Sequence, residues 1–184
     1  MTSRQALGDR ARAANLLGAL STALQERSAV PLGTHPNQSS TATAALKLVS
    51  EAPGCSNAQL AAALSLSHSS TVRLLNRLVD GGLVERRAAT DGRAVALHPT
   101  PAGQRRVEAA LASRRAAMQD VLRRLDSEDV AHLERIAATL LESATTSPVA
   151  GAHLCRLCDQ PSCPQDQCPV HRRAQALAAG TRPT

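Results

Sequence analysis

Four cysteines near the carboxyl end of this 184-residue sequence carry its most distinctive chemistry. They follow the spacing Cys–x2–Cys–x4–Cys–x4–Cys, and the rest of the chain has only one further cysteine, Cys55. Thiolates bind soft metal ions, and a two-residue loop lets two sulfurs converge on one ion. The spacing therefore predicts a shared metal ion, with these ligands: Cys155, Cys158, Cys163 and Cys168.

The expected metal is zinc, although the sequence leaves alternatives open. The spacing equals that of the nucleic-acid-binding zinc knuckle, with Cys163 in the place of a histidine ligand. Four thiolates form a closed structural zinc site, in which we expect the sulfurs within about 4 Å of one another. An iron–sulfur cluster is an alternative, since proline follows Cys168 as in ferredoxin-type runs. Two further alternatives are a thiol switch, in which the cysteines pair on oxidation, and a tail that binds nothing.

The composition indicates a basic, helical protein. The chain has 21 Lys and Arg against 15 Asp and Glu, and it has no Phe, Tyr or Trp. The net charge of +6 suits a polyanionic partner, while the lack of aromatic side chains argues against modules that stack single-stranded bases. Leu, Val and Ala must build the core, which favours helices.

Two classes of protein are excluded by what the sequence lacks. It has no nucleophile motif, phosphate loop or paired carboxylates, and a closed four-thiolate site has no open position for catalysis, so we predict that it is not an enzyme. No apolar run approaches the ~18 residues of a membrane span, and the N-terminus does not resemble a secretory signal. We therefore expect a cytoplasmic protein in which the thiols stay reduced.

Several helices and one hairpin are expected to position these residues. A capping box of Ser56 and Gln59 begins one helix, and Ser67 caps the next. Asp91-Gly92 is a strong hairpin signal between two short extended runs. The stretch 144–152 is interpreted as a linker. Apolar spacing predicts helices within residues 9–27, 41–54, 55–64, 67–82, 101–125 and 128–144.

Two short helices followed by a hairpin have the order of a winged helix-turn-helix, so the expected fold class is mostly α with a small β-hairpin wing. In that design the second helix enters the DNA major groove and the wing lies along the backbone or minor groove. When the apolar residues of 67–82 face inward, polar ones project outward, and arginine can bind guanine through two hydrogen bonds. The predicted DNA-binding residues are Ser69, Ser70, Arg73, Asn76 and Arg77 on the helix, and Arg86, Arg87 and Arg93 on the wing.

The same region resembles the MarR family (multiple antibiotic resistance regulators). Between Leu66 and Arg86 lie apolar–Ser–x–Ser, Arg–apolar–apolar–x–Arg–Leu and Gly–Leu–Val–Glu–Arg, and Asp91-Gly92-Arg93 matches the wing motif Asp–x–Arg. Pro99 stands where a strand leucine is usual, and the wing is about a residue shorter than is common. The resemblance, over residues 9–145, implies a DNA-binding regulator. It also implies a homodimer clasped by its first and last helices, a pseudo-palindromic operator and a small-molecule effector, often an aromatic acid.

Two hypotheses follow for the function. The first is a dimeric transcriptional regulator, a repressor, that carries a C-terminal four-cysteine metal or redox site. The second is a metal- or redox-dependent protein interaction module that uses the winged helix to contact its partner. The apolar stripes of the first and last helices support the dimer, because a ~60-residue winged helix cannot cover them all. The expected segments are a dimerisation helix and loop at 1–38, the winged helix at 39–100, dimerisation helices at 101–146 and the cysteine-rich tail at 147–184.

Overall fold

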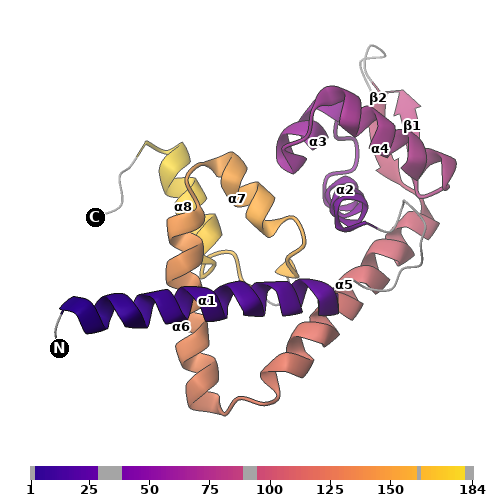
Figure 1. Ribbon diagram of the computed structural model, residues 1–184. Helices are drawn as coiled ribbons and strands as arrows, with labels where there is room; N and C mark the ends of the chain where they lie inside the picture. The colour runs from indigo at the N-terminus through magenta and orange to yellow at the C-terminus, as the bar shows by residue number, and fades with distance from the viewer. Residues whose placement is uncertain (1–2, 29–38, 89–94, 161–162, 181–184) are drawn as a thin grey trace.

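The computed structural model describes residues 3–28, 39–88, 95–160 and 163–180. Over these residues the chain is mostly helical with one antiparallel hairpin, which confirms the expected fold class (Figure 1). The winged-helix unit consists of α2 (Ser40–Glu51), α3 (Asn57–Leu64), α4 (His68–Asp80), β1 (Val84–Ala88) and β2 (Val95–Pro99). The remaining helices are α1 (Ser3–Ser28), α5 (Pro101–Leu122), α6 (Ser127–Ala144), α7 (Pro148–Cys155) and α8 (Pro169–Ala178).

The expected helix caps are present. Ser56 Oγ accepts a hydrogen bond from the backbone N–H of Gln59 at 3.2 Å, and Gln59 Oε1 accepts one from the N–H of Ser56 at 2.8 Å. Ser67 Oγ accepts from the N–H of Ser70 at 3.2 Å at the start of α4. These side chains satisfy N–H groups that have no partner within the helix, which fixes where α3 and α4 begin.

The hairpin pairs β1 and β2 in antiparallel register, with Val84 opposite Pro99 and Ala88 opposite Val95. Pro99 is the last residue of β2, and a two-stranded sheet has only edge strands, which tolerate proline. An isolated bridge between Cys55 and Leu97 joins the loop before α3 to β2. The wing is thereby connected to the loop before α3 as well as to α4.

The hydrophobic core lies within the winged-helix unit. Its aliphatic side chains come from all three of its helices and both strands, and α5 adds Val107. By contrast α6 has no buried residue. The largest fully buried apolar side chains are Leu46, Val49, Leu60, Leu75, Leu78, Val84 and Leu97.

The segment after α6 differs from its expected form. The interpretation of 144–152 as a linker is wrong in part, because α7 begins at Pro148, with Ser147 Oγ accepting from the N–H of Ala150 at 3.1 Å. Proline is favoured at this first helical position, and Pro169 begins α8 in the same way. Gly151 is buried where α7 and α8 cross, since a Cβ there would lie 3.2 Å from Ala174 Cβ.

The helices after the wing connect two parts of the molecule (Figure 1). Helix α5 leads away from the winged-helix unit to α6, and α1 contacts α5. Helix α8 packs against α6 and α7, and α7 also contacts α3. The tail thus lies between α6 and the winged-helix unit. None of the helices in the described ranges is long and apolar enough to cross a membrane.

Candidate nucleic-acid interface and cysteine cluster

Helix α4 presents one apolar and one polar face. Thr71, Leu74, Leu75 and Leu78 are buried against the core. The polar residues predicted from the sequence lie on the other side: Ser69, Arg73, Asn76 and Arg77 are exposed, and Ser70 is half-buried. The exposed face therefore offers two guanidinium groups, an amide and hydroxyls to a partner.

The first strand of the wing adds cations beside this face. Arg86 and Arg87 are exposed on β1. Arg86 Nη2 donates a hydrogen bond to Asn76 Oδ1 at 2.6 Å, and Arg73 Nη2 donates to Ser70 Oγ at 3.2 Å. The Asn76–Arg86 bond joins α4 to the wing, so the two elements present their polar side chains as one surface. This surface, defined by Ser69, Ser70, Arg73, Asn76, Arg77 and Arg86, is called the α4–wing face. Arg87 points to the other side of β1, where it pairs with Glu85.

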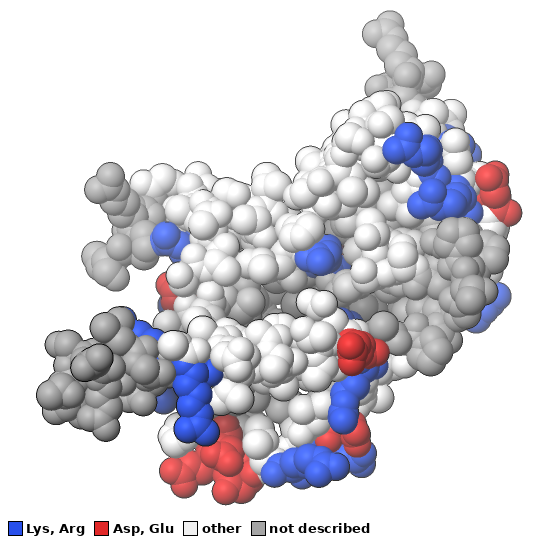
Figure 2. Space-filling view, viewed as in Figure 1, with Lys and Arg blue, Asp and Glu red and all other residues white. Residues whose placement is uncertain are grey.

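Arg93 cannot be assigned to that surface, because it lies outside the described residues together with the rest of 89–94. Its role at the wing stays a prediction. In the view of Figure 2, Lys and Arg gather over the winged-helix end, while most of the acidic side chains lie at the lower end of α6, among further basic ones. This distribution gives the α4–wing end a positive character that suits a polyanion.

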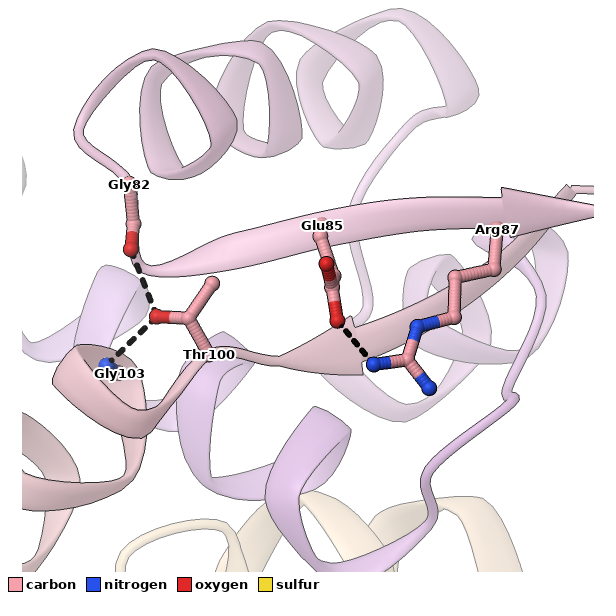
Figure 3. Close-up of polar contacts among 5 residues, drawn as sticks. All are labelled: Gly82, Glu85, Arg87, Thr100 and Gly103. Carbon is pink, nitrogen blue, oxygen red and sulfur yellow. Dashed lines mark hydrogen bonds and ion pairs between the residues drawn. The ribbon is translucent and has the colours of Figure 1, made fainter.

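The base of the wing is fixed by Thr100, whose contact with Gly82 the sequence did not predict (Figure 3). Its Oγ1 donates to the carbonyl of Gly82 at 2.6 Å and accepts from the N–H of Gly103 at 3.0 Å. Arg87 forms an ion pair with Glu85 along β1. A threonine followed by a proline is a typical helix start, so the cap at Thr100-Pro101 follows from the sequence. The bond from Thr100 to Gly82 depends instead on the tertiary fold.

The four tail cysteines border the turn between α7 and α8. Cys155 is the last residue of α7 and Cys168 immediately precedes α8. Burial raises the pKa of the Cys155 thiol to about 12, and the proximity of Cys158 and Cys168 adds to the rise. Burial also raises the pKa of Cys163, and among the thiols Cys168 contributes most to this rise. All four are free thiols, which we call the cysteine cluster.

The thiols of the cluster lie near one another. Each of the other three is close enough to Cys155 to contribute to the rise of its pKa. In the described residues no three His, Cys, Asp or Glu side chains are arranged as a ready metal site. The expectation that the four sulfurs already converge is therefore wrong for this structure. Four thiolates would repel one another without a cation, so convergence of the sulfurs is coupled to ion binding.

Two nitrogen atoms near the cluster have unusual surroundings. His153 Nδ1 on α7 and Arg173 Nη1 on α8 are both buried without a hydrogen-bond partner in the described structure. Buried polar atoms are nearly always paired, so such atoms call for an explanation. Both residues belong to the helices that border the cysteine cluster, α7 and α8.

Cys55 is separate from this cluster. It is half-buried against the winged-helix core, where burial raises the pKa of its thiol. Such surroundings are typical of a cysteine that packs as a small apolar residue.

Comparison with known proteins supports a winged helix of the MarR type. Residues 39–94 match the model of the MarR family. A MarR family protein from Bacillus stearothermophilus has a TM-score of 0.65 and 23% identity, with 79% of this chain and 99% of that chain covered. FabT of Streptococcus pneumoniae, solved in complex with DNA, has a TM-score of 0.62 and 19% identity, with 71% and 94% covered.

A third solved structure is more similar in sequence. The MarR family protein RV2887 of Mycobacterium tuberculosis, in complex with p-aminosalicylic acid, is 28% identical. Its TM-score is 0.52, and the match covers 69% of this chain and 96% of that chain. The search of curated proteins gave no match.

Proposed function

We propose that this protein is a homodimeric, sequence-specific regulator of transcription that binds double-stranded DNA and acts as a repressor. The observation that carries the proposal is the α4–wing face, in which the exposed polar side of a helix-turn-helix is joined to the wing by the Asn76–Arg86 bond. In this arrangement Arg73 and Arg77 would read base edges in the major groove, while Arg86 would contact phosphates.

The similar proteins support the same function. FabT, which shares the fold, was solved with DNA bound, and the MarR family consists of transcription regulators rather than enzymes. RV2887 was solved with p-aminosalicylic acid, which favours a small-molecule effector for this chain as well. A pseudo-palindromic operator follows from two-fold symmetry in a dimer.

The dimer is supported by apolar side chains that one chain leaves uncovered. Leu16 and Leu17 on α1 are 58% and 54% exposed, and Ile136 and Leu140 on α6 are 49% and 50% exposed. Contiguous apolar stripes of this kind mark interaction surfaces in proteins without membrane spans. Packing α1 and α6 across a two-fold axis would cover them and place two α4 helices about one DNA turn, ~34 Å, apart.

The cysteine cluster is proposed to hold one zinc ion in a closed, structural site. The donors would be the four thiolates, which would leave the site with a charge of about −2. Arg173 on α8, whose Nη1 is buried without a hydrogen-bond partner, would balance part of that charge, and so would Arg156, which is half-buried at the end of α7. An iron–sulfur cluster on the same thiolates is the alternative.

The DNA-binding function is tested by selecting duplexes from a random-sequence library with the full-length protein. The selected duplex should bind at least about 10³-fold more tightly than a scrambled one of equal length, and log K should fall linearly with log salt. Equal affinity for both duplexes would refute sequence-specific binding and favour the interaction-module hypothesis.

The metal proposal is tested on protein purified without oxygen. We expect a colourless protein with one zinc per chain, and none after Cys158 and Cys163 are both changed to serine. A brown protein with visible absorbance would identify iron–sulfur instead. Metal-free protein with four freely alkylated tail thiols would refute both.

A further inference from the structure

We infer that metal binding at the cysteine cluster controls DNA binding, because the cluster connects the winged-helix unit to the helices proposed to form the dimer. The inference rests on the proposed DNA-binding function and the proposed zinc site. It adds that the ion regulates the affinity for DNA, besides stabilising the fold of the tail.

One side of the connection reaches the winged-helix unit. Helix α7, which ends at Cys155, contacts α3, the first helix of the helix-turn-helix. Leu157, between Cys155 and Cys158, packs against the hydrophobic core that also contains Leu60 and Leu64 of α3. A side chain of the cysteine-bearing turn is therefore part of the packing that supports α3 and, through it, α4.

The other side reaches the long helices. Asp159 follows Cys158 directly and accepts a hydrogen bond from Arg115 Nη1 of α5 at 2.5 Å. Helix α8, which follows Cys168, packs against α6. The cluster thus has firm contacts on both sides of the boundary between α5–α6 and the winged-helix unit.

Ion binding would alter this connection through its geometry. No three His, Cys, Asp or Glu side chains of the described residues are placed to hold a metal ion, whereas a tetrahedral ion needs all four sulfurs within about 4 Å of one another. Bringing the four sulfurs together must shift the turn that carries Leu157 and Asp159. Those two residues hold α3 and α5, so the shift reaches the helix-turn-helix.

The direction of the effect follows from preorganisation. Four metal–sulfur bonds would fix α7 and α8 relative to each other and so limit the movement of α3 against α5 and α6. A dimer with two winged helices held at a constant separation loses less freedom when both engage one operator. Zinc-loaded protein should therefore bind the operator more tightly than zinc-free protein.

The test compares full-length protein with and without zinc, using the best duplex recovered by in vitro selection with zinc-loaded protein. We expect removal of zinc under reducing conditions to lower the affinity for that duplex at least tenfold, and added zinc to restore it. A change below twofold, or a rise in affinity on zinc removal, overturns the inference.

The path is tested by the double variant Leu157→Ala with Arg115→Ala, which keeps all four cysteines. It should still bind one zinc per chain, but its DNA affinity should change less than twofold with zinc. The matched control, Leu154→Ala with Arg114→Ala, removes the same atoms one to three residues away and should keep the tenfold response. Equal loss of response in both variants would indicate general loosening and overturn the assigned path.

Failure of the proposed function gives different results. Protein that takes up no zinc refutes the metal site, and protein that binds zinc but prefers no duplex refutes DNA binding. Only protein that does both, with an affinity that does not respond to zinc, overturns the regulatory inference alone.

Discussion

Arg73 and Arg86 are both exposed arginines of the α4–wing face, but their surroundings give them different roles. Arg73 lies on the outer side of α4, where its Nη2 donates a hydrogen bond to the hydroxyl of Ser70 one turn away. Its guanidinium is therefore available for base edges. Arg86 is held by Asn76 at 2.6 Å and is suited to a phosphate beside the helix. Base-reading residues set specificity, while phosphate contacts contribute affinity to every sequence.

Replacing Arg73 by Ala should therefore weaken binding to the selected duplex by roughly 1–3 kcal/mol and relax the preference at one base pair. Fluorescence anisotropy with the selected duplex and its single-base variants would measure both effects. Arg124→Ala is the control, because Arg124 is an exposed arginine in the turn between α5 and α6, and Figure 1 shows this turn at the end of α5 that points away from the winged-helix unit. Wild-type affinity in the Arg73 variant would contradict the assignment of α4 as the reading helix.

The Cys55 thiol gives a prediction about pH. Burial raises the pKa of Cys55 above the value of about 8.5 expected in the unfolded chain, so its contribution to stability is complete below that pH and is lost as the pH rises further. The free energy of unfolding should thus fall more steeply between pH 8 and pH 10 in the wild type than in Cys55→Ala. Chemical denaturation at several pH values would measure the difference. Parallel curves for the two proteins would be inconsistent with a buried thiol.

The residues of the interface were predictable only where local pattern decides their position. The outward side of α4 follows from its spacing, and Ser69, Arg73, Asn76 and Arg77 are exposed as predicted. The Asn76–Arg86 and Thr100–Gly82 bonds join residues 10 and 18 positions apart. Such contacts depend on how the hairpin folds back on the helix, which spacing does not encode.

At the level of elements, the junction between the wing and α5 depends on Gly103. A Cβ at this position would lie 2.0 Å from the carbonyl oxygen of Leu83, which is a backbone atom and cannot rotate away. The start of α5 can therefore approach the start of β1 only because residue 103 has no side chain. Thr100 closes the same junction through its bonds to Gly82 and Gly103 (Figure 3).

Gly103→Ala should lower the free energy of unfolding by about 2 kcal/mol or more, since the added carbon forces the backbone of α5 and β1 apart. Thermal and denaturant unfolding monitored by circular dichroism would measure the loss. Ala102→Gly, at the exposed neighbouring position, should cost no more than about 1 kcal/mol. Comparable stabilities for the Gly103 variant and the wild type would show that the junction is looser than described.

The two tail helices show where element prediction from the sequence failed. Ser147-Pro148 is a good helix start, but the stretch that follows is short and rich in small residues, so it has the pattern of a linker. Its helical form depends on packing, because Gly151 is in close contact with α8 and Thr145. A helix this short is marginal alone and needs tertiary contacts.

For the whole molecule, the uncovered apolar side chains of α1 and α6 are the main argument that one chain is incomplete. The helical stripes were visible in the sequence, whereas their exposure, 40% for Leu133 and 44% for Leu20, required the structure. Burying an unpaired charge at such a surface costs more free energy than burial of the apolar side chain contributes to association.

Ile136→Glu should therefore raise the dimer dissociation constant at least about tenfold. Arg135→Glu, on the opposite face of α6 by helical spacing, places the same charge outside the stripe and should change it little. Equilibrium sedimentation at micromolar concentration distinguishes the two. A wild-type protein that is monomeric at these concentrations would contradict the dimer before any variant is made.

The central claim is that two copies of α4 read one duplex at a separation set by the dimer. The most direct measurement is the affinity of the full-length protein for its selected duplex before and after five base pairs are inserted between the half-sites. Half a helical turn moves the second half-site to the far side of the DNA, so we predict a loss of at least about 100-fold, with a dimer bound to the original duplex. An affinity that the insertion leaves unchanged would contradict the account, because the two recognition helices would then not be held together on one face of the DNA.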